Sequence, residues 1–118
     1  MFYPCILVRI LITNRPSIKQ AFGESLTKNS LLRHLDLDSN PLTGTDGDYD
    51  GIKQLAAALE KNTSLTSLNL HRCGLKEKGG RAVSTGLDRN HTLLFVDIGN
   101  NAVELEDERH IADKLVQN

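Results

Sequence analysis

Tryptophan is absent from this chain, aromatic residues make up only 4% of it, and the formal net charge is −1 over 118 residues. The scarcity of aromatic side chains argues against a stacking platform for single-stranded nucleic acid. The nearly balanced charge gives no attraction toward nucleic acid or an anionic membrane surface. Only two cysteines are present, which argues against a disulfide-rich scaffold and favours a reducing compartment such as the cytoplasm.

The amino-terminal segment, residues 1–13, is apolar enough to raise the question of a signal peptide or a membrane anchor. It lacks a basic start, Arg9 interrupts its apolar run, and no small-residue cleavage site follows. The run is also too short to span a bilayer. We therefore expect neither a signal peptide nor a membrane partner.

One pattern of apolar residues occurs three times in the chain. It reads L-x-x-L-x-L-x-x-N/C-x-L, with other aliphatic residues allowed in place of leucine. The pattern opens at Leu32, Leu65 and Leu93, and its polar position is taken by Asn40, Cys73 and Asn101. Because strand side chains alternate sides, the two leucines that are two residues apart face a core while their neighbours face outward. The pattern predicts three short parallel strands.

Helical periodicity follows each strand. Apolar residues four positions apart predict one helix with a buried stripe in each repeat. These pairs are Phe22 and Leu26, Leu55 and Leu59, Val83 and Leu87, and Ile111 and Leu115. We interpret the Asn-x-Ser/Thr sequences at Asn62 and Asn90 as parts of the helix-to-strand loops and not as glycosylation sites.

Three further features narrow the type of repeat. The spacing from Leu65 to Leu93 is 28 residues, Gly51 and Gly79 precede the helical stripes, and residues 54–59 are rich in alanine. Over roughly residues 17–118 the chain thereby resembles the ribonuclease-inhibitor-like subclass of the leucine-rich repeat family. The resemblance implies an α/β solenoid, a short right-handed horseshoe segment with a parallel sheet on the concave face and helices on the convex face.

The resemblance also implies roles for the polar positions of the pattern. The amides of Asn40 and Asn101 are expected to satisfy backbone groups of adjacent turns, and Cys73 is expected to be a small buried residue in the same place. The shared scaffold does not identify a function, because this subclass includes proteins of many activities.

We expect a single domain, residues 1–118. Residues 1–31 form a degenerate first repeat, 32–64 and 65–92 are full repeats, and 93–118 form a last repeat that is either a cap or truncated. In the first repeat we prefer to align Leu7, Ile10 and Ile12 with the apolar strand positions, which shortens the connection to the helix by three residues. A strict count back along the 28-residue period would place Pro4, Leu7 and Arg9 there, and only one of these suits a core. The alternative is that this segment is a non-native or fragmentary beginning.

A five-residue insertion lengthens the first full repeat to 33 residues. It contains Asp46, Asp48 and Asp50, alternate carboxylates like those that begin a calcium loop. The glutamate that such a loop needs at its twelfth position is missing, because Ala57 stands there. We expect a solvated turn-rich loop, with weak calcium or magnesium binding by the three aspartates as the alternative, and no cofactor.

The sequence contains no recognisable catalytic pattern, so we expect no enzymatic activity. Residues 78–80 lack the spacing of a phosphate-binding loop, and Ser84 lies within a predicted helix and not on a nucleophile elbow. What remains is the outward face of the strands, through which solenoids recognise other proteins. The residues that we assign to partner binding are His34, Asp36, Asp38, Asn69, His71, Arg72, Phe95 and Asp97.

Two functions fit this surface. The first is a non-catalytic interaction module or scaffold in a cytoskeletal or ciliary assembly, with Phe95 as apolar anchor and a basic segment as the complementary partner. The alternative is a GTPase-activating protein resembling the Ran-specific leucine-rich repeat family, for which Arg72 is the one arginine at a strand exit. We also expect end-to-end self-association through the apolar amino-terminal edge.

Overall fold

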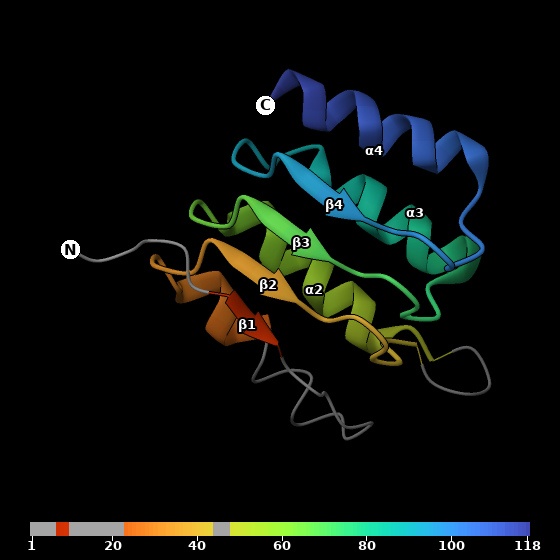
Figure 1. Ribbon diagram of the computed structural model, residues 1–118, viewed down its shortest axis with the longest axis horizontal. Coiled ribbons are helices and arrows are strands. Elements are labelled where there is room, and N and C mark those ends of the chain that lie inside the picture. The colour runs from red at the N-terminus through yellow and green to blue at the C-terminus, as the bar shows by residue number, and fades with distance from the viewer. Residues whose placement is uncertain (1–6, 10–22, 44–47) are drawn as a thin grey trace.

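The computed structural model describes residues 7–9, 23–43 and 48–118, and strands alternate with helices along them. The strands are β1 (Leu7–Arg9), β2 (His34–Asp36), β3 (Ser67–Asn69) and β4 (Phe95–Asp97). The helices are α2 (Asp50–Lys61), α3 (Lys76–Leu87) and α4 (Leu105–Gln117), and residues 23–28 are also helical. The helices lie together on one side of the sheet (Figure 1).

The strands form one parallel sheet in the order of the chain, β1-β2-β3-β4. The repeats are in register, with Leu35 opposite Leu68 and Leu68 opposite Val96. Parallel strands need a crossover connection, and the helices supply it. The predicted α/β solenoid, with its sheet on one face and its helices on the other, is confirmed.

The core lies between the sheet and the helices and is built from the predicted positions. The strand leucines Leu35, Leu37, Leu68 and Leu70 are at most 1% exposed. Of the predicted helix pairs, the buried members are Leu26, Leu55, Leu59, Val83, Leu87 and Ile111, with Leu115 partly buried; Phe22 lies outside the described residues. The burial confirms that each described helix turns one apolar stripe toward the strands.

The register predicted for the first strand was wrong. β1 pairs with β2 so that Val8 lies opposite Leu35, whereas we expected Ile10 there, or Leu7 by the strict count. Val8 and Leu35 are 27 residues apart, so the connection is shortened by one residue and not by three. The sequence could not fix this register, because a segment that is apolar at nearly every position has no alternation to select one.

The helix-to-strand loops are held by buried asparagines. Asn62 donates from Nδ2 to the Leu26 carbonyl at 2.8 Å, in the preceding repeat, and its Oδ1 accepts the Leu65 N–H at 2.8 Å. Asn90 repeats this arrangement with the Leu59 carbonyl and the Leu93 N–H, both at 2.8 Å. Each side chain therefore satisfies backbone groups of two repeats, which supports the structural interpretation of both Asn-x-Ser/Thr sequences.

The strand exits carry a second set of bridging side chains. Asn101 donates to the Leu70 carbonyl at 2.7 Å and accepts the Cys73 N–H at 2.8 Å, across the repeat boundary. The Cys73 thiol is buried and donates to the Leu37 carbonyl at 3.1 Å, again in the preceding repeat. Asn40 donates to the Leu37 carbonyl at 3.0 Å, within its own repeat, so bridging by Asn40 stays a prediction. The expected bridging by Asn101 and the expected burial of Cys73 are both confirmed.

The helices pack closely on one another. A Cβ added to Gly86 would come within 2.8 Å of the Ala56 carbonyl oxygen, so glycine permits the contact between α3 and α2. Between α3 and α4, Arg81 Nε lies 2.9 and 3.1 Å from the two carboxylate oxygens of Asp107, whose side chain is only 4% exposed.

Among the described helices, none combines the length and the apolar character needed to cross a bilayer.

Candidate partner-binding site

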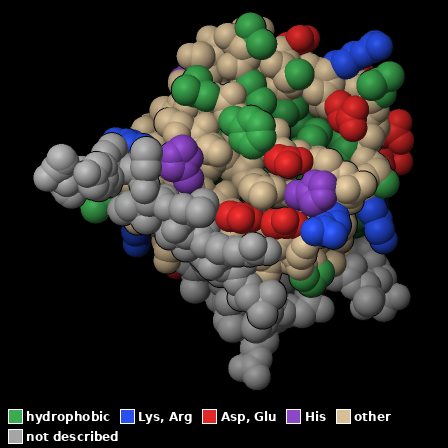
Figure 2. All heavy atoms as spheres, in the orientation of Figure 1, with side chains coloured by type: hydrophobic (Ala, Val, Ile, Leu, Met, Phe, Trp, Pro, Cys, Tyr) green, Lys and Arg blue, Asp and Glu red, His purple; other side chains and the backbone are tan. Residues whose placement is uncertain are grey.

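The strands turn alternate side chains away from the helices, and these make one continuous surface, which we call the sheet face. Its residues are His34, Asp36, Asp38, Ser67, Asn69, His71, Phe95, Asp97 and Gly99, with Arg72 and Asn100 at the strand exits. Acidic and histidine side chains gather over the middle of this face, and hydrophobic ones over its β4 side (Figure 2). All eight residues that we predicted for partner binding belong to it.

The register aligns Asp36, Asn69 and Asp97 in one column across three strands. Each uses a side-chain oxygen to accept the backbone N–H two residues later, at 2.9, 2.9 and 2.8 Å. This short turn fixes the side chain relative to its strand. The same register brings Arg9 of β1 level with Asp36. The column is therefore a rigid row of polar groups.

His71 connects the last two repeats at the strand exits. Its Nδ1 lies 3.6 Å from Asp97 Oδ1, and its Nε2 lies 3.1 Å from Asn100 Nδ2. Gly99 leaves room for the ring, because a Cβ at that position would be 2.9 Å from Nδ1. Sequence reasoning placed Asn100 at a strand exit but did not assign it to the site, because its contact with His71 depends on how two loops pack.

Arg72 is highly exposed, and its Nε lies 3.8 Å from Asp38 Oδ1. The backbone of Arg72 has a φ of 51°, and the equivalent residues Ser39 and Asn100 have φ of 63° and 56°. A left-handed residue at the same point of each repeat turns the chain away from the sheet and puts its side chain at the rim. The exit loops thus repeat in conformation while they differ in chemistry.

An apolar corner lies at the start of β4. Phe95 is 56% exposed and Leu94 is 60% exposed. We predicted Phe95 as an anchor but missed Leu94. A signal was available, since the third repeat reads Leu-Leu-Phe from Leu93 where the others read Leu-Arg-His and Leu-Thr-Ser. Two adjacent apolar residues are therefore exposed at the start of β4.

Other candidate sites from the sequence gain no further support. Asp46 lies outside the described residues, and Asp48 accepts the Asp50 N–H at 3.0 Å where α2 begins. In the described part of the chain, no three His, Cys, Asp or Glu side chains are grouped as metal ligands would be. Weak calcium or magnesium binding stays a prediction. Ser84 lies within α3, as expected.

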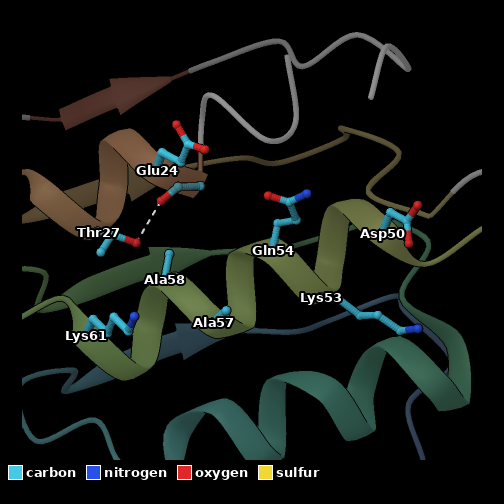
Figure 3. A pocket seen from close by; sticks show the side chains of 9 residues that line it. Glu24, Thr27, Asp50, Lys53, Gln54, Ala57, Ala58 and Lys61 are labelled. Carbon is cyan, nitrogen blue, oxygen red and sulfur yellow. Dashed lines mark hydrogen bonds between the residues drawn. The ribbon is translucent and has the colours of Figure 1, made fainter. Parts of the chain in front are cut away.

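A groove of about 390 Å³ lies on the helix side, between residues 23–28 and α2 (Figure 3). Its lining mixes charged, amide and small apolar side chains, among them Glu24, Asp50, Lys53, Gln54 and Lys61. Thr27 contributes its hydroxyl to the Gly23 carbonyl at 2.9 Å, within its own helical segment. These groups do not converge on a common point, so the sheet face is the better candidate site.

Comparison with known proteins agrees with this geometry. The family model described as "Leucine Rich repeat" matches residues 28–48 and 61–84. NACHT, LRR and PYD domains-containing protein 4C of Mus musculus is 30% identical over 104 residues, which cover 85% of this chain and 10% of that protein. Centrosomal protein of 78 kDa of Mus musculus is 31% identical over 88 residues, 74% of this chain and 11% of that protein. This chain therefore spans about a tenth of the length of these relatives.

Among solved structures, leiomodin-1 actin-binding site 2 (ABS2) is similar in fold. It has a TM-score of 0.72 and 26% sequence identity, and the match covers 94% of this chain and 62% of that one. The repeated apolar pattern, the parallel strands in register, the bridging amides and the matching family model all agree. The chain belongs to the leucine-rich repeat family.

Proposed function

We propose that this chain is a non-catalytic protein-binding module of a cytoskeletal assembly and that it holds its partner through the sheet face. The observation that carries the proposal is the row of accessible side chains on strands in register, from Asp36 on β2 to Phe95 and Asp97 on β4. These strands are fixed by the core beneath them, so binding requires little ordering of the backbone.

The charge and shape of the sheet face favour a partner with a basic segment and an apolar side chain. Three carboxylates, Asp36, Asp38 and Asp97, share the face with the guanidinium of Arg72. The exposed pair Leu94 and Phe95 offers the apolar contact. An aromatic anchor beside complementary charges is a common arrangement at protein interfaces.

The relatives support a cytoskeletal partner in the cytoplasm. One similar solved structure is named as an actin-binding site, and one curated relative is named as a centrosomal protein. Monomeric actin is therefore the first partner to test. The ciliary location expected from the sequence has no further support and stays a prediction.

The test is direct binding of purified monomeric actin to the full chain, measured by biolayer interferometry. The sheet-face variant combines Asp36→Asn, Asp97→Asn and Phe95→Ala, in which each asparagine keeps the oxygen that accepts the backbone N–H. The matched control combines Glu108→Gln, Asp113→Asn and Leu105→Ala on exposed positions of α4, with the same loss of charge and one apolar truncation. We expect the sheet-face variant to bind about tenfold or more weakly, or not at all, and the control to bind as wild type does. Equal binding by all three proteins would contradict the proposal.

The alternative activity, stimulation of GTP hydrolysis, has no additional support from the described residues. Arg72 is exposed at a strand exit beside Asp38, and no observation assigns it to a nucleotide. Faster GTP hydrolysis by Ran in the presence of the purified chain would overturn the non-catalytic proposal.

The predicted self-association concerns residues 1–13, of which only 7–9 are described, and it stays a prediction. Deletion of this segment, followed by light scattering, can test it.

A further inference from the structure

We infer that the groove between α3 and α4 is a second binding site, which accepts an arginine side chain of a partner protein. Both walls of the groove are described helices, and they lie on the side of the sheet away from the sheet face (Figure 1). Each helix of a solenoid packs between its two neighbours, so a further repeat would contact the other side of α4. The groove has a volume of about 410 Å³, and its lining residues are Arg81, Ser84, Asp88, Glu106, Asp107, Arg109, His110 and Asp113.

The hydroxyl of Ser84 is the first observation that points to a ligand. Ser84 is only 4% exposed and lines the groove, and among the described residues none forms a hydrogen bond with its side chain. Its neighbour Thr85, by contrast, donates its hydroxyl to the Arg81 carbonyl at 2.9 Å. Buried polar groups in native proteins nearly always have a hydrogen-bond partner, because an unsatisfied one costs free energy. A donor that enters the groove would supply the missing partner of Ser84.

Two pairs of side chains cross the groove on either side of Ser84. One turn before it, Arg81 holds Asp107, and one turn after it, Asp88 Oδ1 lies 2.5 Å from His110 Nε2. These pairs fix the two helices relative to each other at both ends of the groove. Ser84 therefore lies at a site whose walls are already in place before a ligand binds.

The charge of the groove favours a cation. Its lining holds four carboxylates and two guanidinium groups, so its formal charge is −2 when His110 is neutral. Glu106 and Asp113 lie on the same side of α4 as His110, four residues before it and three after it. Neither carboxylate forms an ion pair with a described residue, and the exposed guanidinium of Arg109 pairs with none of the described carboxylates. Two carboxylates and one buried hydroxyl are thus left to a cationic ligand.

The arrangement of these acceptors favours arginine over a metal ion or lysine. Within the described part of the chain, the carboxylate and histidine side chains are not grouped as a metal ion requires. The acceptors come from both helices, with Ser84 on α3 and with Glu106 and Asp113 on α4. The guanidinium of arginine carries five donors in a fixed plane and can contact both walls at once, whereas the ammonium of lysine is a single point of charge.

The probe is a peptide Gly-Ser-Arg-Ser-Gly with both ends capped, titrated into the ¹⁵N-labelled full chain. We expect saturable shifts of the amide signals around Ser84 and Asp113. A lysine peptide should bind about three- to tenfold more weakly, and a citrulline peptide, which keeps the shape but not the charge, should show no saturable binding. The sheet-face variant should bind the arginine peptide as wild type does, which separates this inference from the sheet-face proposal.

Substitutions in the groove test the roles of its acceptors. Ser84→Ala should weaken binding of the arginine peptide about three- to tenfold and should not lower the melting temperature of the free protein, because the hydroxyl has no described partner to lose. Glu106→Gln combined with Asp113→Asn should weaken binding about tenfold or more. The matched control is Glu104→Gln combined with Glu108→Gln, exposed positions at the start of α4 that do not line the groove, and it should bind as wild type does.

Several results would overturn the inference. Absence of binding to the wild-type protein, or equal binding of the arginine and citrulline peptides, would show that the groove does not recognise a guanidinium. Equal effects of the two carboxylate pairs would indicate attraction to the overall charge of α4 and not to the groove. A lower melting temperature of Ser84→Ala would show that its hydroxyl serves the fold, and loss of peptide binding in the sheet-face variant would place the arginine on the other face.

Discussion

The side-chain amide of Asn101 accepts the backbone N–H of Cys73 at 2.8 Å and donates to the Leu70 carbonyl at 2.7 Å. One buried residue of the last repeat thereby holds the strand exit of the repeat before it. Its Oδ1 also accepts the Leu75 N–H at 3.3 Å. The cohesion of neighbouring repeats consequently depends on single polar side chains as well as on the apolar core.

We expect Asn101→Ala to lower the free energy of unfolding by about 1–3 kcal/mol, because buried backbone groups lose their partner. Urea denaturation followed by circular dichroism measures the change. The control is Asn100→Gly at the adjacent exposed residue, where glycine tolerates the φ of 56°. Its effect should stay within about 0.5 kcal/mol. If Asn101→Ala and Asn100→Gly lowered the free energy of unfolding by similar amounts, the bridging role of Asn101 would be contradicted.

The thiol of Cys73 should be inert in the folded protein. Burial is the main cause that raises its pKa from 9.0 to about 11, and the Asp38 carboxylate adds to this, while the backbone hydrogen bond from Asn40 opposes it. In a Cys5→Ser background, Ellman's reagent at pH 8 should react with Cys73 only after unfolding. Rapid reaction under native conditions would show that the thiol is accessible.

The raised pKa of the Cys73 thiol predicts that the folded protein loses stability at alkaline pH. Because the folded pKa lies above the unfolded one, the unfolded state loses the thiol proton first, so stability is intact below about pH 9 and falls as the pH rises toward 11. A shift of this size corresponds to about 2–3 kcal/mol across that range. Urea denaturation between pH 8 and pH 11 should show a steeper decline in the Cys5→Ser protein than in the same protein with Cys73→Ala. If the stability of both proteins declined equally with pH, the raised pKa of Cys73 would be contradicted.

Gly86→Ala should destabilise the protein although alanine is the better helix former. In an open helix the change would gain about 1 kcal/mol, but here the new Cβ would meet the Ala56 carbonyl oxygen at 2.8 Å. We expect a net loss of about 1–3 kcal/mol from overpacking between α3 and α2. Thermal unfolding measures it, with Thr85→Ala on the exposed side of α3 as the control. A higher melting temperature for Gly86→Ala would show that the helices can separate without cost.

Removal of Arg81 should loosen the contact between α3 and α4. The buried carboxylate of Asp107 would lose the guanidinium that lies within 3.1 Å of both its oxygens. We expect Arg81→Met to lower the melting temperature more than Arg109→Met does, since Arg109 is exposed and its loss leaves the contact between α3 and α4 intact. Equal melting temperatures of the two variants would indicate that the pair contributes nothing to stability.

Much of the fold could be predicted because the repeat ties each residue type to a position. Cys73 and Asn101 occupy the same point of the pattern, and each is buried there with a bond across a repeat boundary. The sheet face could be predicted for the same reason, since strand alternation alone decides which side chains leave the core. Membership in the ribonuclease-inhibitor-like subclass, the division into repeats and the binding role of the sheet face stay predictions.

The details that escaped prediction depend on contacts between repeats. The pair of Arg81 and Asp107 requires the rotation of two helices about their axes, which no local pattern specifies. The contact of His71 with Asn100 requires two exit loops to pack together. Similarly, the segment around β1 is apolar at most positions, so no alternation of apolar and polar residues identified the register that pairing with β2 selects.

The most direct test of the sheet face is photocrosslinking in cells with p-benzoylphenylalanine in place of Phe95, and in place of Thr85 on the exposed side of α3 as control. We expect one discrete adduct with a cytoskeletal protein from position 95, weakened when Asp36→Asn and Asp97→Asn are added, and none from position 85. An adduct from position 85 alone, or one from position 95 that the two substitutions leave unchanged, would contradict it.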